Sequence, residues 1–194
     1  MKFSDGPRYE FRQFGADLKS VRDRFATLGE GKKHPERRET YIVTRLNIDS
    51  NVKTRAGKLE VKVLRGRQQS LELWERTLSA EFPLSIDDVE TKVLPALGLD
   101  IEIGDRGALT EGTLMALVSG EHALATIDVE KERTLFDLGN CEAEFCKLRI
   151  GDEKLHTISI ETPDAGVAAE VLAKVGLGDA ENESYAAFLQ RRLF

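Results

Sequence analysis

Pairs of charged residues two positions apart recur where this sequence alternates between apolar and polar residues. The pairs are Lys53 with Arg55, Glu60 with Lys62, and Glu142 with Glu144. Side chains at positions i and i+2 of a β-strand point to the same face. A sheet built from these strands would carry cations and carboxylates on one surface, as a site for a polyanion and a metal ion requires. The alternative is an ordinary solvated strand face, since such faces are usually charged.

Charge is unevenly distributed along the 194 residues. Residues 1–76 contain 18 Lys and Arg against 11 Asp and Glu, a net charge of +7, whereas residues 77–194 contain 10 against 23, a net charge of −13. The whole chain therefore carries −6, which argues against bulk nucleic-acid binding but does not exclude a local basic face. Length and the lack of a linker favour a single domain over residues 1–194.

The alternation predicts many antiparallel strands covered by a few helices. We expect strands at 9–14, 39–47, 51–56, 58–65, 70–82, 113–118, 122–130, 134–137, 141–149 and 154–161, a charged loop at 30–38 and an irregular segment at 100–112. Capping signals predict helices that begin near Asp17, Ser85 and Asp164, followed by a short helix within 181–194. This plan belongs to the α+β class and is compatible with a closed sheet.

Cysteine usage and hydropathy predict the compartment. Cys141 and Cys146 lie five positions apart on one predicted strand and hence on opposite faces, so we expect reduced thiols rather than a disulfide. No apolar run is long enough to span a bilayer, and the first residues contain no apolar signal segment. We therefore expect a cytoplasmic protein without membrane association. Its scattered histidines lack the spacing of a zinc site.

Several short motifs follow one another along nearly the whole chain. They are Glu10-Phe-Arg12-Gln-Phe14, Thr40-Tyr41, Val52-Lys-Thr-Arg55, Gly57-Lys-Leu-Glu-Val-Lys62, Cys141-Glu-Ala-Glu144, Ile158-Ser-Ile-Glu161 and Ser184-Tyr185. Their order resembles that of the CYTH family, the triphosphate tunnel metalloenzymes, which include class IV adenylate cyclases, thiamine triphosphatases and inorganic triphosphatases. The resemblance implies an antiparallel eight-stranded β-tunnel, a closed barrel with covering helices.

The resemblance also implies a site inside this tunnel. The carboxylates that would hold Mg²⁺ or Mn²⁺ and support catalysis are Glu10, Glu142 and Glu144. The cations that would bind phosphate are Lys53, Arg55 and Lys62, with Arg12 as a further candidate. In such a site the cations neutralise a triphosphate, and the metal polarises a phosphoryl oxygen or activates a water.

The sequence departs from the family signature Glu-x-Glu-x-Lys at two positions. Arg12 stands in place of the second Glu and Phe14 in place of the Lys. A guanidinium instead of a carboxylate reverses the charge at the metal end, and Arg12 can pair with Glu142 or Glu144 and lock the tunnel without metal. The segment that begins at Tyr41 also lacks the usual acidic partner of this tyrosine.

Three functional hypotheses follow. The first is a metal-dependent phosphohydrolase that acts on triphosphate or polyphosphate compounds. The second is a catalytically degenerate tunnel that binds an anionic metabolite, or a protein partner, without metal. The third and weakest is a nucleic-acid contact through the basic segment that contains Lys32, Lys33, Arg37 and Arg38.

Overall fold

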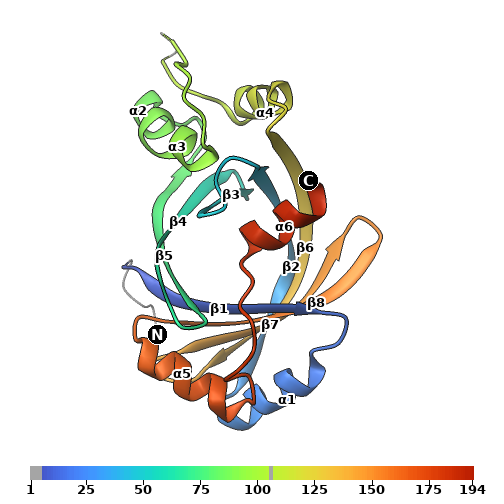
Figure 1. Cartoon of the computed structure of the whole chain (residues 1–194). Helices are drawn as coiled ribbons and strands as arrows, with labels where there is room; N and C mark the ends of the chain where they lie inside the picture. Colours follow the sequence, from blue (N-terminus) through green and yellow to red (C-terminus); the bar gives the residue numbers. More distant parts are fainter. Residues whose placement is uncertain (1–5, 105–106) are drawn as a thin grey trace. The chain divides into compact units, whose positions relative to one another are not determined.

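The computed structural model describes residues 6–104 and 107–194. Eight antiparallel strands form a closed barrel in the order β1-β5-β4-β3-β2-β6-β7-β8 (Figure 1). The strands are β1 (Arg8–Gly15), β2 (Gly31–Thr44), β3 (Ser50–Arg55), β4 (Lys58–Gln68), β5 (Leu71–Glu81), β6 (Leu124–Asp137), β7 (Glu142–Ile150) and β8 (Glu153–Thr162). The closed eight-stranded barrel of the α+β class predicted from the sequence is confirmed.

The helices are α1 (Lys19–Leu28), α2 (Ile86–Asp88), α3 (Leu94–Leu97), α4 (Glu111–Gly120), α5 (Ala165–Lys174) and α6 (Tyr185–Leu193). A π-helical turn, Val89–Val93, joins α2 to α3. The wider turn precedes Pro95, which has no N–H to donate to an α-helical ladder. None of the described helices is long and apolar enough to cross a membrane.

The chain divides into two compact units, each with its own apolar core. Unit 1 consists of Met1–Arg38, Leu64–Glu75 and Val129–Ser184, and unit 2 of Glu39–Val63, Arg76–Asp128 and Tyr185–Phe194. Strands β2, β4, β5 and β6 contribute residues to both units. A single domain over residues 1–194 stays a prediction.

In unit 1, one face of β1, β7 and β8 packs against α1 and α5, which lie on the same side of these strands (Figure 1). Phe11, Phe145 and Ile158 from the strands meet Phe25 of α1 and Leu172 of α5, and all five are at most 2% exposed. Because side chains alternate across a strand, the residues between these positions point to the opposite face. That opposite face is polar.

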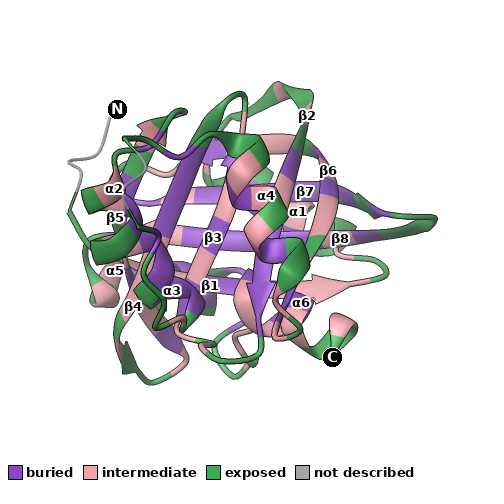
Figure 2. Cartoon of the chain, turned by 90° about the horizontal axis from the view of Figure 1, so that it is seen from above, coloured by how far each residue is buried: buried purple, intermediate pink, exposed green. Residues whose placement is uncertain are grey.

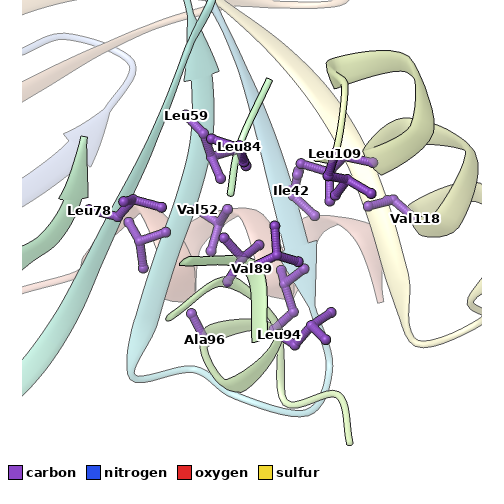
Figure 3. Close-up of a cluster of buried hydrophobic side chains, with 14 of the residues drawn as sticks. Ile42, Val52, Leu59, Leu78, Leu84, Val89, Leu94, Ala96, Leu109 and Val118 are labelled. Atoms are coloured by element: carbon purple, nitrogen blue, oxygen red, sulfur yellow. The ribbon is translucent and has the colours of Figure 1, made fainter. Parts of the chain in front are cut away.

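In unit 2, alternate residues of β3 and β4 pack against the helical segment 86–97 and α4. Val52, Val89 and Leu94 point toward one another in this core (Figure 3). Buried and half-buried residues alternate along β3 (Figure 2). The half-buried positions of β3 include Lys53 and Arg55, which therefore share the face opposite to the core.

Three parts of the predicted plan are wrong. Residues 31–38 of the predicted loop 30–38 are the first part of β2. Segment 113–118 belongs to α4 rather than to a strand: Thr110 caps this helix, and Leu114 and Val118 pack into the unit 2 core. Segments 122–130 and 134–137 form one strand, β6, instead of two. A short apolar run is compatible with either helix or strand, so packing decides between them. Of the predicted segment 100–112, residues 105 and 106 lie outside the described part.

The caps predicted at Ser85 and Asp164 are confirmed: their side-chain oxygens accept hydrogen bonds from the backbone N–H groups of Asp88 and Gly166. Helix α1 begins near the predicted place, but its N-cap is Leu18 rather than Asp17, although the Asp17 carboxylate does accept a hydrogen bond from Lys19 N–H. The predicted free thiols are confirmed as well, because Cys141 and Cys146 are buried without a disulfide. Burial raises the pKa of both thiols to about 12, which keeps them protonated and poorly reactive.

Candidate functional site

The polar face of unit 1 carries a group of charged side chains that we call the Arg12 cluster: Arg12 of β1, Lys131 and Arg133 of β6, and Glu144 of β7. Arg12 Nη1 lies 3.6 Å from Glu144 Oε1, and Arg133 Nε donates to Glu144 Oε2 at 2.5 Å. Arg12 Nη1 also donates to Thr157 Oγ1 of β8 at 3.3 Å. The side chains of Arg12, Arg133 and Glu144 are 10–12% exposed, and Lys131 is buried.

Three cations of this cluster act on Glu144. Burial raises the pKa of Glu144, but the positive charges of Arg12, Arg133 and Lys131 outweigh this effect and hold the pKa below its ordinary value. Glu144 is therefore ionised at neutral pH. The sequence allowed Arg12 to pair with Glu142 or with Glu144, and the structure contains the ion pair with Glu144.

A positive potential extends from the Arg12 cluster to the first part of β2. Burial lowers the pKa of His34, and Arg133, Lys32 and Arg37 lower it further, while Glu144 opposes them. Burial and the nearby cations thus both favour the neutral imidazole of His34.

A row of four glutamates lies next to the cluster, at directly paired positions of neighbouring strands. Glu72 of β5 is paired with Glu10 of β1, Glu10 with Glu161 of β8, and Glu161 with Glu142 of β7. Like charges at paired positions repel each other. Among these carboxylates, Glu72 accepts a hydrogen bond from Trp74 Nε1 at 3.0 Å.

The crowding of carboxylates predicts that Glu142→Gln raises the free energy of unfolding, by an amount that depends on pH. Burial raises the pKa of Glu142, and Glu161 raises it further. Because this pKa lies above that of the unfolded chain, protonation stabilises the folded state, and the benefit is lost as the pH rises through the folded pKa. We expect the variant's free energy of unfolding to exceed that of the wild type by up to about 1 kcal/mol at pH 7.5, the size of one unfavourable cross-strand pair. Near pH 4 we expect no difference.

Urea unfolding at the two pH values would measure this difference. The matched control is Glu132→Gln, since Glu132 forms an exposed ion pair with Lys147 at 2.8 Å that lowers its pKa. This control should lose at most about 1 kcal/mol at pH 7.5. A loss of stability at pH 7.5 in Glu142→Gln would contradict the crowding argument.

The three predicted metal ligands are not brought together as one ligand set. Glu144 is engaged by two guanidinium groups, whereas Glu10 and Glu142 belong to the carboxylate row with Glu161 between them. Residues 6–104 and 107–194 contain no group of three His, Cys, Asp or Glu side chains placed to hold one ion. Mg²⁺ and Mn²⁺ require several oxygen ligands at short distance. The geometry therefore does not fit the predicted metal site, which stays a prediction together with its catalytic role.

The polar face of unit 2 carries a second group, the Glu39 cluster: Glu39 of β2, Lys53 and Arg55 of β3, and Glu60 of β4. Lys53 Nζ lies 3.3 Å from Glu39 Oε2 and 3.4 Å from Glu60 Oε2. Arg55 lies 3.3 Å from Glu39 Oε1 and 2.5 Å from Glu60 Oε1. Two cations and two carboxylates balance each other. Glu39 is 0% exposed, and it also accepts a hydrogen bond from the Tyr41 hydroxyl at 3.0 Å.

The predicted phosphate-binding residues of unit 2 share this face. The side chains of Lys53 and Arg55 are 15% and 31% exposed, so solvent reaches them despite their ion pairs. Lys62 lies two positions from Glu60 on β4 and pairs with Asn51. A role of these cations in phosphate binding stays a prediction.

Helix α6 packs on the same face of β2 and β3. The Tyr185 ring stacks on the Tyr41 ring, with centroids 5.1 Å apart and an interplanar angle of 24°. Gln190 Nε2 donates to the Thr44 carbonyl oxygen at 2.8 Å. The C-terminal helix thus holds the tyrosine that contacts Glu39.

Two parts of these clusters were missed from the sequence. Lys131 and Arg133 fell into the expected break between two strands, although their spacing of two residues continues through β6. Glu39 is an acidic partner of Tyr41, contrary to the expectation that this tyrosine lacks one. The signal was present two positions before the tyrosine, because residues i and i−2 share a strand face.

These features define a closed antiparallel barrel whose strands bear buried, charged polar faces. No protein-family model matches the sequence, and no curated protein matches it significantly. Solved structures do match. A Pyrococcus horikoshii protein aligns with a TM-score of 0.52 at 14% identity, over 91% of this chain and 94% of that one.

Two other solved structures align equally well. A candidate adenylate cyclase from Bacillus halodurans has a TM-score of 0.51 at 13% identity, over 97% of this chain and 99% of that one. The Mimivirus capping enzyme triphosphatase has a TM-score of 0.51 at 6% identity, over 89% and 91% of the two chains. At these identities the likeness shows the fold alone. The closed eight-stranded barrel expected from the sequence is confirmed, and these solved structures share its fold.

Proposed function

We propose that this protein binds a small phosphorylated anion of the triphosphate or polyphosphate type on the polar faces of its barrel strands. The observation that carries the proposal is the Arg12 cluster, in which Arg12 and Arg133 contact Glu144, Lys131 acts on the same carboxylate, and Arg12 also contacts the Thr157 hydroxyl. Guanidinium and ammonium groups make strong, charge-assisted hydrogen bonds to phosphate oxygens. The fold likeness to a triphosphatase supports this ligand class.

The Glu39 cluster supports the same ligand class in a different way. Glu39 and Glu60 hold Lys53 and Arg55 in defined positions before any ligand arrives. Cations that are held in place lose less side-chain entropy on binding, which favours affinity. These two residues and Lys62 are the second candidate set of phosphate ligands.

Metal-dependent hydrolysis is less well supported than binding. With Glu10, Glu142 and Glu144 as the ligands of Mg²⁺ or Mn²⁺, Glu144 would have to exchange two guanidinium partners for the ion. A divalent cation at Glu144 would also lie beside Arg12 and Arg133, whose positive charges repel it but attract a phosphate. Nucleic-acid binding rests only on exposed Lys32, Lys33 and Arg38 of β2. Competition between an oligonucleotide and tripolyphosphate tests this alternative.

Calorimetric titration of inorganic tripolyphosphate into the full chain tests the proposal. We expect binding that weakens as salt is raised from 50 to 250 mM, and at least tenfold weaker binding in Arg133→Gln, since this change removes one of three cations. The matched control is Arg149→Gln, whose exposed ion pair with Glu130 lies outside the cluster. Absence of binding, or displacement of tripolyphosphate by an oligonucleotide of equal charge at lower concentration, would contradict the proposal.

A further inference from the structure

We infer that this protein binds its phosphorylated ligand without a divalent metal ion, and that the Arg12 guanidinium takes the place of the metal as the cation facing the phosphate. The inference deepens the proposed function and rests on it. It follows from the position, the attachment and the neighbours of Arg12, and from the disagreement between these side chains and the predicted metal site.

The position of Arg12 is set by strand register. Arg12 of β1 is paired with Ser159 of β8, and Ser159 with Glu144 of β7. This row lies two residues along each strand from the row that contains Glu10, Glu161 and Glu142, and it shares the same face. A permanent positive charge therefore adjoins the carboxylates on which a metal site would depend. It repels a divalent cation there.

The attachment of Arg12 keeps this charge in place. Its backbone N–H donates to Asn182 Oδ1 at 2.7 Å, and its carbonyl oxygen accepts from Glu183 N at 2.9 Å. Its guanidinium contacts Glu144 and Thr157. Both the backbone and the side chain are thus fixed, so that Arg12 is preorganised and does not have to be displaced for a ligand to bind.

The neighbours of Arg12 suit a phosphate group. Arg133 is held by the same carboxylate, which orients the two guanidinium groups toward a common region. Lys131 adds a third charge that acts on Glu144. Guanidinium forks match pairs of phosphate oxygens, and several together neutralise a terminal phosphate as a metal ion would. A phosphate that enters this region competes with Glu144 for the same donors.

Titration of tripolyphosphate in EDTA, and of its preformed Mn²⁺ complex in a buffer with Mn²⁺, tests the inference on the whole chain of 194 residues. We expect dissociation constants that agree within about threefold, since a permanent cation replaces the metal. In EDTA, Arg12→Gln should weaken binding at least tenfold. The matched control is Arg22→Gln, because Arg22 forms an exposed pair with Asp23 on α1. Thermal unfolding of each variant confirms that it is folded.

The outcomes separate the two proposals. Binding that is at least tenfold tighter with Mn²⁺ than with EDTA would overturn the metal-free mode and leave the proposed function standing. Absence of binding in both buffers would overturn the proposed function and this inference with it. Titration of Mn²⁺ alone adds a readout that needs no phosphate: we expect no binding by the wild type and measurable binding by Arg12→Glu, which restores the family carboxylate beside Glu10. Tight Mn²⁺ binding by the wild type would overturn the inference.

Discussion

Glu39→Gln is expected to destabilise the folded protein by about 3–5 kcal/mol, the cost of removing one partner from a buried ion pair. Glu39 is fully buried and contacts Lys53, Arg55 and the Tyr41 hydroxyl. The amide preserves shape but removes the negative charge, so two cations depend on Glu60 alone. Urea unfolding would measure this loss. The urea concentration at the midpoint should fall, while the dependence of the unfolding free energy on urea concentration stays unchanged.

Two further variants sharpen this measurement. Glu81→Gln removes an exposed ion pair with Lys58 in the same unit and should cost at most about 1 kcal/mol. The double variant Glu39→Gln/Lys53→Met removes the cation together with its carboxylate and should recover part of the loss, because the remaining cation still has Glu60. A loss below about 1 kcal/mol in Glu39→Gln would show that the cluster is solvated rather than buried.

Glu144→Gln is expected to have two large effects of opposite sign. It leaves Arg12 and Arg133 buried without their shared carboxylate, which should cost about 3–5 kcal/mol of stability. The same change removes the carboxylate that competes with a phosphate for Arg12 and Arg133. Tripolyphosphate should therefore bind roughly tenfold more tightly, a gain of about 1.4 kcal/mol.

Unfolding curves recorded with and without tripolyphosphate measure both effects in one series. Because a ligand stabilises only the folded state, the added stability at a given ligand concentration reports the affinity even for a weakened variant. Glu142→Gln provides the comparison, since it removes a carboxylate of the neighbouring row, where Glu142 is paired with Glu161, and leaves the contacts of Glu144 with Arg12 and Arg133 in place. Weaker binding by Glu144→Gln would mean that Glu144 is needed to orient the arginines more than it competes with the ligand.

Much of the fold could be predicted from the sequence because strand alternation and helix caps are local. The strands at 9–14, 51–56 and 141–149 and the helix that begins at Asp164 agree with the structure within a few residues. The errors at 30–38 and 113–118 arose where local patterns are ambiguous. In the second case the run of apolar residues around Leu114 forms a helix because it fills the unit 2 core.

The candidate site was predictable only as a set of residue types. The pairing of Arg12 with Glu144 was one of two pairings open from the sequence, and register selected it. The acidic partners of Lys53 and Arg55 were missed, since the strand pairs that bring Glu39 and Glu60 to them are contacts between different segments. The resulting charge balance could not be read from composition.

Which side chains share a face of each strand can be inferred from the sequence alone, because the period of two residues is a property of the extended backbone. Which of those faces meet depends on how the strands pair in the folded chain. Glu142 and Glu144 have equivalent positions in the strand pattern. Burial and the paired Glu161 raise the pKa of Glu142, whereas Arg12 and Arg133 outweigh burial and lower the pKa of Glu144. Electrostatic energy depends on distances across strands, and register sets these distances.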